Sequence, residues 1–316
     1  MAKWSLLVTR ESDLLERYIR MLGYDQMFGR LSRVHYKKYL IVSHQGLTSI
    51  YTDQLENKRN LKLSEQEFFS GVSKKLVIFW EREIKHMQRL AQMTRTDFKI
   101  DDFKKFITSY QIIRSAVLYN DYLWRVIERD KKGGWRENLE LIGHWHERAE
   151  RASAGAWDSL APFFARVAKK YGLPKSDLMF YSPDEFFDLV NSGKKISKHQ
   201  IAQRHDYYVL VCLDGRPKLF LGNKARALAK RELPVVKYVS GQELRGVAAA
   251  PGVAIGKVRI VNTKKEMKKM RKGEVVVSYM TTPRLMAAMK KAAAIVTDEG
   301  GLTCHAAIVS RELGIP

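Results

Sequence analysis

Five residues near the end of the sequence have the types and the spacing needed to hold and accept a phosphoryl group: Gly300, Gly301, Thr303, Cys304 and His305. A neutral imidazole is a nucleophile near pH 7. Adjacent glycines allow positive φ angles, and they let the backbone come close to a ligand. A nucleophilic side chain beside such a backbone indicates phosphohistidine chemistry.

Two predicted elements position this histidine. Residues 293–297 are apolar and partly β-branched, which is typical of a buried strand. The stretch after His305 predicts a helix that ends at Gly314, with Thr303 as its N-cap. His305 then lies in the first helical turn, where free N–H groups and the helix dipole favour an anion.

A histidine in a first turn more often caps or packs, and Cys304 is more often a packed residue than a reactive thiol. The residues around His305 favour a catalytic role for it over a purely structural one. The residues from Gly300 to Pro316, Gly-Gly-Leu-Thr-Cys-His-Ala-Ala-Ile-Val-Ser-Arg-Glu-Leu-Gly-Ile-Pro, resemble the phosphohistidine signature of the phosphoenolpyruvate (PEP)-utilising enzymes. The Thr-Cys-His form is more similar to PEP synthase than to pyruvate phosphate dikinase. The resemblance implies that His305 is the phosphoacceptor and that Thr303 is a regulatory phosphorylation site.

The resemblance covers residues 244–316 and implies a β/β/α swivelling phosphohistidine domain. The glycine-punctuated run from Gly246 to Val261 is similar to the opening of that domain. The run from Thr281 to Met289 predicts a helix with Thr282 at N-cap and Pro283 at N1. This chain departs from the family at Arg284 and Ala287, where an acidic residue and a proline are common, so the usual partner surface is in doubt. The family continues beyond Pro316 with further strands, so we expect the domain to be C-terminally truncated.

The predicted fold class is α+β, with a mainly helical N-terminal region. Its predicted divisions are a small α/β segment with a hairpin over 1–60, a helical region over 61–205, and a hairpin connector over 206–243. Within these divisions we expect a strand at 4–9, a helix at 12–22, a hairpin at 38–51, a capping box at Ser64 and Glu67, helices near 101–130, 136–152 and 157–171, a helix capped by Ser182 and a hairpin at 206–221.

The function implied by the resemblance is a phosphoryl-carrier component of a PEP synthase-like phosphotransferase. Residues 1–243 lack the glycine-rich, lysine-bearing phosphate cradle and the paired carboxylates that ATP and Mg²⁺ require. We therefore expect no cofactor on this chain itself, and an enzyme component that is incomplete alone. ATP, Mg²⁺ and pyruvate or PEP are expected on separate ATP-grasp and PEP-binding partner proteins.

Composition leaves one rival function open. The formal charge is +22, which suits a regulatory or nucleic-acid-binding protein that has kept the swivelling fold. The run Ile196–Arg204 resembles half of a helix-turn-helix, although one helix leading into a hairpin fits it better. His144 and Glu147 could share a helix face, but we expect a solvated or packed pair and no metal site.

Cellular location is predicted from the cysteines and the apolar runs. There are two cysteines, Cys212 and Cys304, so no disulfide framework is implied and a reducing cytoplasm is expected. No apolar run approaches the length of a membrane span, so we expect no membrane partner.

Overall fold

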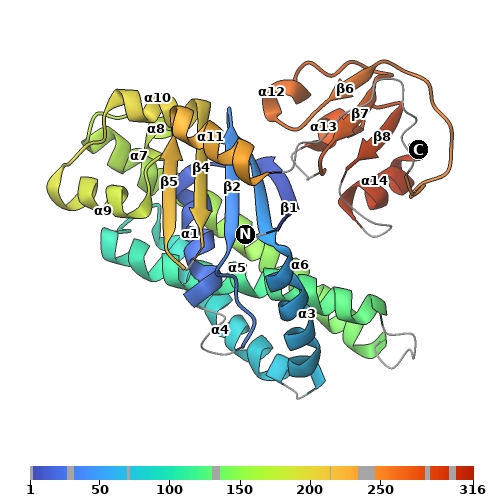
Figure 1. Cartoon of the computed structure of the whole chain (residues 1–316), viewed down its shortest axis with the longest axis horizontal. Helices are drawn as coiled ribbons and strands as arrows, with labels where there is room; N and C mark the ends of the chain where they lie inside the picture. Colours follow the sequence, from blue (N-terminus) through green and yellow to red (C-terminus); the bar gives the residue numbers. More distant parts are fainter. Residues whose placement is uncertain are drawn as a thin grey trace.

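The computed structural model of the chain describes residues 3–26, 32–69, 72–129, 136–213, 215–233, 246–281, 285–298 and 304–316. It shows a larger N-terminal part up to residue 233 and a smaller C-terminal part from residue 246 (Figure 1). The N-terminal part combines an antiparallel sheet with many helices, and the C-terminal part has a parallel sheet. The predicted α+β class is confirmed.

The N-terminal sheet has five strands in the order β1-β3-β2-β4-β5. The strands are β1 (Trp4–Glu11), β2 (Tyr39–His44), β3 (Leu47–Asp53), β4 (Tyr207–Cys212) and β5 (Pro217–Leu221). The turn between β2 and β3 is formed by Gln45 and Gly46, whose φ angles are 50° and 83°. Positive φ at both central residues suits the twist of a two-residue hairpin, so the predicted hairpin is confirmed.

The hairpin formed by β4 and β5 is part of this same sheet. Leu40 of β2 pairs with Val211 of β4, so strands far apart in the sequence are neighbours. The stretches 1–60 and 206–243 therefore contribute strands to one sheet, and helices from 61–205 pack on it.

Side chains alternate along each strand, so successive residues point to opposite faces of the sheet. Residues on both faces are buried, in two separate clusters. Tyr39 and Ile41 of β2 point into the main core, whereas Leu40 joins a second cluster with Val209 and Ala225. The helices are α1 (Leu14–Gln26), α3 (Gln54–Phe69), α4 (Val72–Met93), α5 (Ile100–Arg129), α6 (Arg136–Ser159), α7 (Ala161–Lys170), α8 (Lys175–Leu178), α9 (Pro183–Ser192), α10 (Lys198–Asp206) and α11 (Gly222–Glu232). Helix α11 covers the second face, and most of the other helices lie on the first (Figure 1).

Several predicted helix starts can now be compared with the structure. Ser182 forms the expected capping box with Glu185, at the start of α9. The capping box predicted at Ser64 is wrong, because α3 already runs through it; the hydroxyl of Ser64 instead donates to the Asn60 carbonyl at 2.8 Å. The side chain of Asp53 accepts from the first N–H groups of α3 and marks its true start.

The long helices follow the prediction, except that α6 ends later than predicted and α7 begins at Ala161 and not at 157. Helices α5, α6 and α7 match the three predicted helical stretches, although α6 continues to Ser159 and not to about 152. Helix α10 leads directly into β4, as expected for a single helix before a hairpin and not for a helix-turn-helix.

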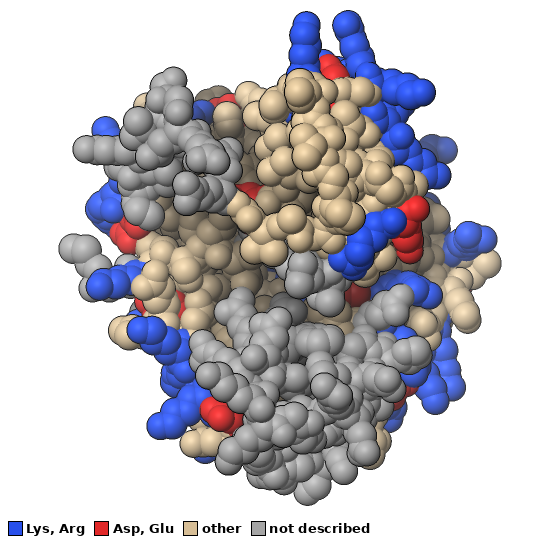
Figure 2. All heavy atoms as spheres, turned by 90° about the vertical axis from the view of Figure 1, so that its right-hand side faces the viewer, with Lys and Arg blue, Asp and Glu red and all other residues tan. Residues whose placement is uncertain are grey.

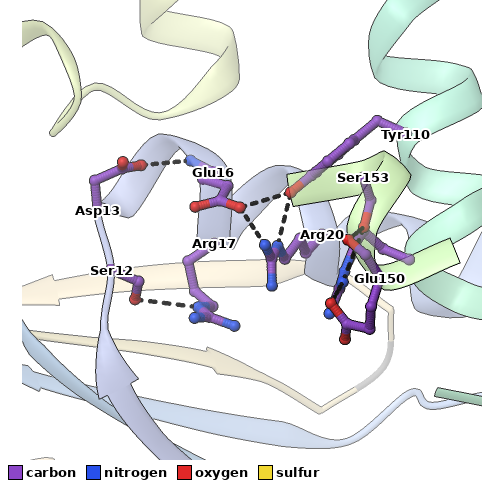
Figure 3. A network of polar contacts seen from close by, with 9 residues as sticks. Ser12, Asp13, Glu16, Arg17, Arg20, Tyr110, Glu150 and Ser153 are labelled. Carbon is purple, nitrogen blue, oxygen red and sulfur yellow. Dashed lines mark hydrogen bonds and ion pairs between the residues drawn. The ribbon is translucent and has the colours of Figure 1, made fainter. Parts of the chain in front are cut away.

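A polar network lies inside the N-terminal part, between α1, α5 and α6 (Figure 3). The Tyr110 hydroxyl donates to Glu16 at 2.6 Å, and Arg20 donates to the Tyr110 oxygen at 3.0 Å and pairs with Glu16. Burial acts to raise the pKa of Glu16, but the charges of Arg20 and Arg17 lower it to about 2. Burial and the charge of Glu16 raise the pKa of Asp13 to about 7. Glu16 is therefore ionised at neutral pH, whereas Asp13 keeps its proton to a higher pH than an ordinary aspartate.

The C-terminal sheet has three parallel strands in the order β6-β7-β8. Its elements are β6 (Val258–Ile260), α12 (Lys264–Met267), β7 (Val275–Ser278), α13 (Met286–Met289), β8 (Ala294–Thr297) and α14 (His305–Leu313). A small core of Val261, Met270, Val276, Leu285, Ala288 and Ala292 holds them together. The strand predicted in the run 246–261 is confirmed only for its last three residues before Val261.

Candidate functional site

Helix α14 places His305 at its first position and ends at Gly314, whose φ is 64°. Cys304 is the N-cap, with extended backbone angles, so the predicted N-cap at Thr303 is wrong by one residue. Ile308 closes the first turn by donating to the Cys304 carbonyl at 3.0 Å. The N–H groups of the first turn have no partner within the helix, and such a helix start favours an anion.

One side chain fixes the imidazole of His305. The Thr281 hydroxyl oxygen lies 3.0 Å from Nδ1 of His305, and Thr281 itself is buried. Burial lowers the pKa of His305 below its ordinary value of 6.5, although the charge of Glu312 acts in the opposite direction. The ring is therefore neutral at pH 7, which is the nucleophilic form.

The turn after β7 positions Thr281. The side-chain oxygen of Asn262 accepts from the backbone N–H of Tyr279 at 2.9 Å. The Ser278 hydroxyl lies within 3.1 Å of the Asn262 side-chain oxygen and 3.0 Å of the Met280 carbonyl. Since these bonds fix the three residues before Thr281, the hydroxyl that contacts His305 comes from an ordered turn.

The sequence-predicted site is described in part. Gly300, Gly301 and Thr303 lie outside the described residues, whereas Cys304 is a half-buried free cysteine beside His305. Sequence reasoning did not identify Thr281 as the partner of His305. The signal available was the Thr-Thr-Pro run at 281–283 after a buried strand, because strand ends in a parallel sheet meet at one edge.

The helix predicted from Thr281 to Met289 needs a correction. Helix α13 begins at Met286 with Leu285 as its N-cap, and residues 282–284, which carry the predicted cap, lie outside the described part of the chain. The side chains of Leu285, Met289 and Ala292 are buried.

Metal binding and membrane insertion find no support in the described ranges. Within them, no three His, Cys, Asp or Glu side chains are grouped so that they could hold a metal ion. The side chains of His144 and Glu147 are not among those described; Trp145 between them is buried against Trp80, with ring centroids 4.6 Å apart. None of the helices that the structure describes is both long and apolar enough to span a bilayer.

Three known proteins similar to this chain are named as phosphoenolpyruvate synthases or probable ones. Residues 270–316 match the PEP-utilising enzyme mobile domain. A probable phosphoenolpyruvate synthase of Archaeoglobus fulgidus is 60% identical over 73 residues, covering 23% of this chain and 10% of that protein. The phosphoenolpyruvate synthase of Pyrococcus furiosus is 35% identical over 212 residues, covering 65% of this chain and 24% of that protein. That of Aeropyrum pernix is 39% identical over 167 residues, covering 49% of this chain and 20% of that protein.

The chain thus spans less than a quarter of the length of each of these relatives. The matched region includes β7, α13, β8 and α14, and therefore both Thr281 and His305. Residues 270–316 are a mobile domain of the PEP-utilising enzyme family, in a chain related to phosphoenolpyruvate synthases.

Proposed function

We propose that the chain is the phosphoryl-carrier component of a phosphotransferase of the phosphoenolpyruvate synthase type, with His305 as the phosphoacceptor. The observation that carries the proposal is the position of His305 as the first residue of α14, with its Nδ1 3.0 Å from the Thr281 hydroxyl. Burial, which lowers the pKa of His305, favours the neutral, nucleophilic ring. The mobile-domain match over residues 270–316 supports it.

The contact with Thr281 decides which nitrogen reacts. When Nδ1 carries the proton and donates it to the Thr281 oxygen, the lone pair on Nε2 is free. Nε2 then attacks the phosphorus of a donor phosphoryl group, an Nε2–P bond forms, and the P–O bond to the leaving group breaks. In the transfer step an acceptor oxygen attacks the same phosphorus, the Nε2–P bond breaks and the neutral imidazole returns.

The start of α14 stabilises the charge of the carried group. A phosphoryl group on His305 lies beside first-turn N–H groups that have no partner within the helix. The helix dipole adds about 0.3–1 kcal/mol for an anion at such a position. This stabilisation is small enough for the phosphoryl group to be both accepted and released.

A carrier needs sites that load and unload it. We infer that ATP, Mg²⁺ and pyruvate or PEP bind to ATP-grasp and PEP-binding partner proteins, and that His305 shuttles between those sites. The names of the relatives in Pyrococcus furiosus and Aeropyrum pernix support PEP synthesis as the overall reaction.

A chase experiment tests whether the chain both accepts and donates a phosphoryl group. The purified chain is incubated with the Pyrococcus furiosus synthase and with PEP, or with ATP labelled at the β or the γ phosphorus, and is then re-isolated by size. Pyruvate and fresh synthase are added next. We expect label on the chain after the first step and labelled PEP after the second, and neither with His305→Ala. Label that enters the chain but cannot be chased would contradict the carrier role, and turnover by the isolated chain would contradict the need for partners.

A further inference from the structure

A positively charged surface lies at the amino-terminal end of the C-terminal sheet, the end opposite His305. Because β6, β7 and β8 are parallel, the segments that enter them meet at one edge. Those segments carry five cations, which we call the basic edge: Lys257 before β6, Arg271 and Lys272 before β7, and Lys290 and Lys291 before β8.

Backbone hydrogen bonds hold these segments side by side. The Val275 N–H donates to the Lys257 carbonyl at 2.8 Å, and the Gly273 N–H donates to the Lys291 carbonyl at 2.9 Å. All five side chains of the basic edge are exposed. In Figure 2, Lys and Arg side chains gather at the top and the upper right of the molecule, with Asp or Glu side chains among them.

The charge of the basic edge is not neutralised by the acid nearest in the sequence. Glu274 is buried and paired with Arg259, whose hydrogen bonds, with that from the Arg271 N–H, lower the pKa of Glu274 to about 2. Among the described residues, none forms an ion pair with a side chain of the basic edge, whereas exposed lysines elsewhere, such as Lys104 and Lys194, have an aspartate partner. Five unpaired like charges repel one another, and a bound polyanion relieves that repulsion.

The basic edge does not serve the phosphate chemistry of His305. His305 follows the carboxyl end of β8, while the basic edge precedes the amino ends of the strands. A strand of four residues such as β7 spans about 13 Å. This exceeds the Debye length of about 8 Å at physiological ionic strength, so exposed charges at the two ends are largely screened from each other.

The geometry points to the basic edge as a docking surface for the phosphate backbone of a nucleic acid, bound without regard to base sequence. Four of its five members are lysines, which act as point charges, whereas paired recognition of carboxylates favours the fork of arginine. The segments that carry it, 252–257, 268–274 and 290–293, contain no aromatic residue on which bases could stack. Its three strand ends extend over about 10 Å. A duplex presents about six phosphate charges over that length.

The test measures binding of a fluorescein-labelled DNA duplex of mixed sequence, about 20 base pairs long, by anisotropy between about 50 and 200 mM salt. The basic-edge variant replaces Lys257, Arg271, Lys272, Lys290 and Lys291 by Gln. We expect its dissociation constant at about 50 mM salt to rise at least about tenfold. The slope of log K against log salt should fall in magnitude by about 3 or more, because each phosphate contact contributes about 0.9.

A matched control removes the same charge elsewhere. Replacing the exposed Lys58, Lys62, Lys85, Lys195 and Lys198 by Gln should weaken binding less than about threefold and leave the slope within about 1. Equal losses in the two variants, or no binding by the wild type, would overturn the proposal. So would binding of polyglutamate as tight as that of DNA, since it would indicate an acidic protein partner.

Three further variants keep the test decisive. If circular dichroism shows that the basic-edge variant is unfolded, the single variants Lys272→Gln and Lys291→Gln take its place. Each should lower the magnitude of the slope by about 1, and unchanged slopes would overturn the proposal. His305→Ala should bind DNA like the wild type. Loss of phosphorylation without loss of DNA binding therefore separates this docking surface from the carrier function.

Discussion

The hydroxyl of Thr281 lies 3.0 Å from Nδ1 of His305, and this contact joins the end of β7 to the start of α14 across 24 residues of sequence. It leaves Nε2 as the ring nitrogen available to a phosphoryl donor when Nδ1 carries the proton. The contact has consequences for both the rate and the position of phosphorylation.

Replacing Thr281 by Val keeps the shape of the side chain but removes the hydroxyl. One hydrogen bond contributes about 1 kcal/mol, so we expect His305 to be phosphorylated roughly five- to tenfold more slowly. NMR of ¹⁵N-labelled protein should find the phosphoryl group on Nε2 in the wild type and on both nitrogens in Thr281→Val. The control Thr281→Ser keeps the hydroxyl and should behave like the wild type. A Val variant with unchanged rate and unchanged position would remove Thr281 from the site.

The pH dependence of phosphorylation should show a shifted acidic limb. Burial lowers the pKa of His305, so the imidazole stays neutral below the ordinary histidine value of 6.5. We expect the acidic limb of the initial rate of label incorporation to be centred below pH 6.5. Between the folded pKa and 6.5 the unfolded chain binds more protons, so protein stability also falls there with falling pH. An acidic limb centred above 6.5 would contradict this environment for His305.

A glycine in the C-terminal part is required by close backbone packing. A Cβ atom added to Gly256 would overlap the carbonyl oxygen of Gly273, whereas one added to Gly246 would meet open space. We expect Gly256→Ala to lower the free energy of unfolding by about 1–3 kcal/mol. Gly246→Ala should change it by less than about 0.5 kcal/mol. Urea unfolding of the two variants measures the difference. Equal stabilities would show that the backbone at Gly256 can move away from Gly273 without cost.

The acidic pair at the start of α1, Asp13 and Glu16, should make stability depend on pH in a particular direction. Asp13 has a raised pKa of about 7, so the folded protein binds a proton that the unfolded chain has already lost. Its contribution to stability is therefore lost as the pH rises from about 4 to about 7. Asp13→Asn cannot ionise, yet it keeps an oxygen that can accept from the Glu16 N–H, which lies 2.8 Å from the Asp13 oxygen. Urea unfolding between about pH 5 and pH 8 should show that the free energy of unfolding of the Asn variant rises relative to that of the wild type as the pH rises. A constant difference would contradict the raised pKa.

Local signals in the sequence predicted most of the elements correctly. The Gln45-Gly46 turn, the capping box of Ser182 and the helix end at Gly314 each depend on the backbone preference of one or two residues. The same kind of signal was misleading at Ser64 because a serine inside a helix can bond to the carbonyl four residues earlier. A capping pattern therefore predicts a helix start only where the residues before it are not already helical.

Long-range partners could not be predicted from the sequence. The pairing of β2 with β4 and the contact of Thr281 with His305 depend on how distant segments pack, and no single residue encodes either relationship. The histidine itself was identified because its string is long and matches a family signature. The Thr281 hydroxyl that orients it was missed because a Thr-Thr-Pro run is common in turns and does not mark which threonine has a long-range partner.

The most direct test of the carrier account is the chemistry of the phosphorylated chain. A phosphoryl group on imidazole nitrogen is labile to acid and stable to alkali, unlike one on serine or threonine. After incubation with labelled donor and the Pyrococcus furiosus synthase, we expect one acid-labile phosphate per chain. His305→Ala should lose it with its far-UV circular dichroism unchanged. Label that survives in His305→Ala, or label that resists acid, would contradict the assignment of His305 as the phosphoryl carrier.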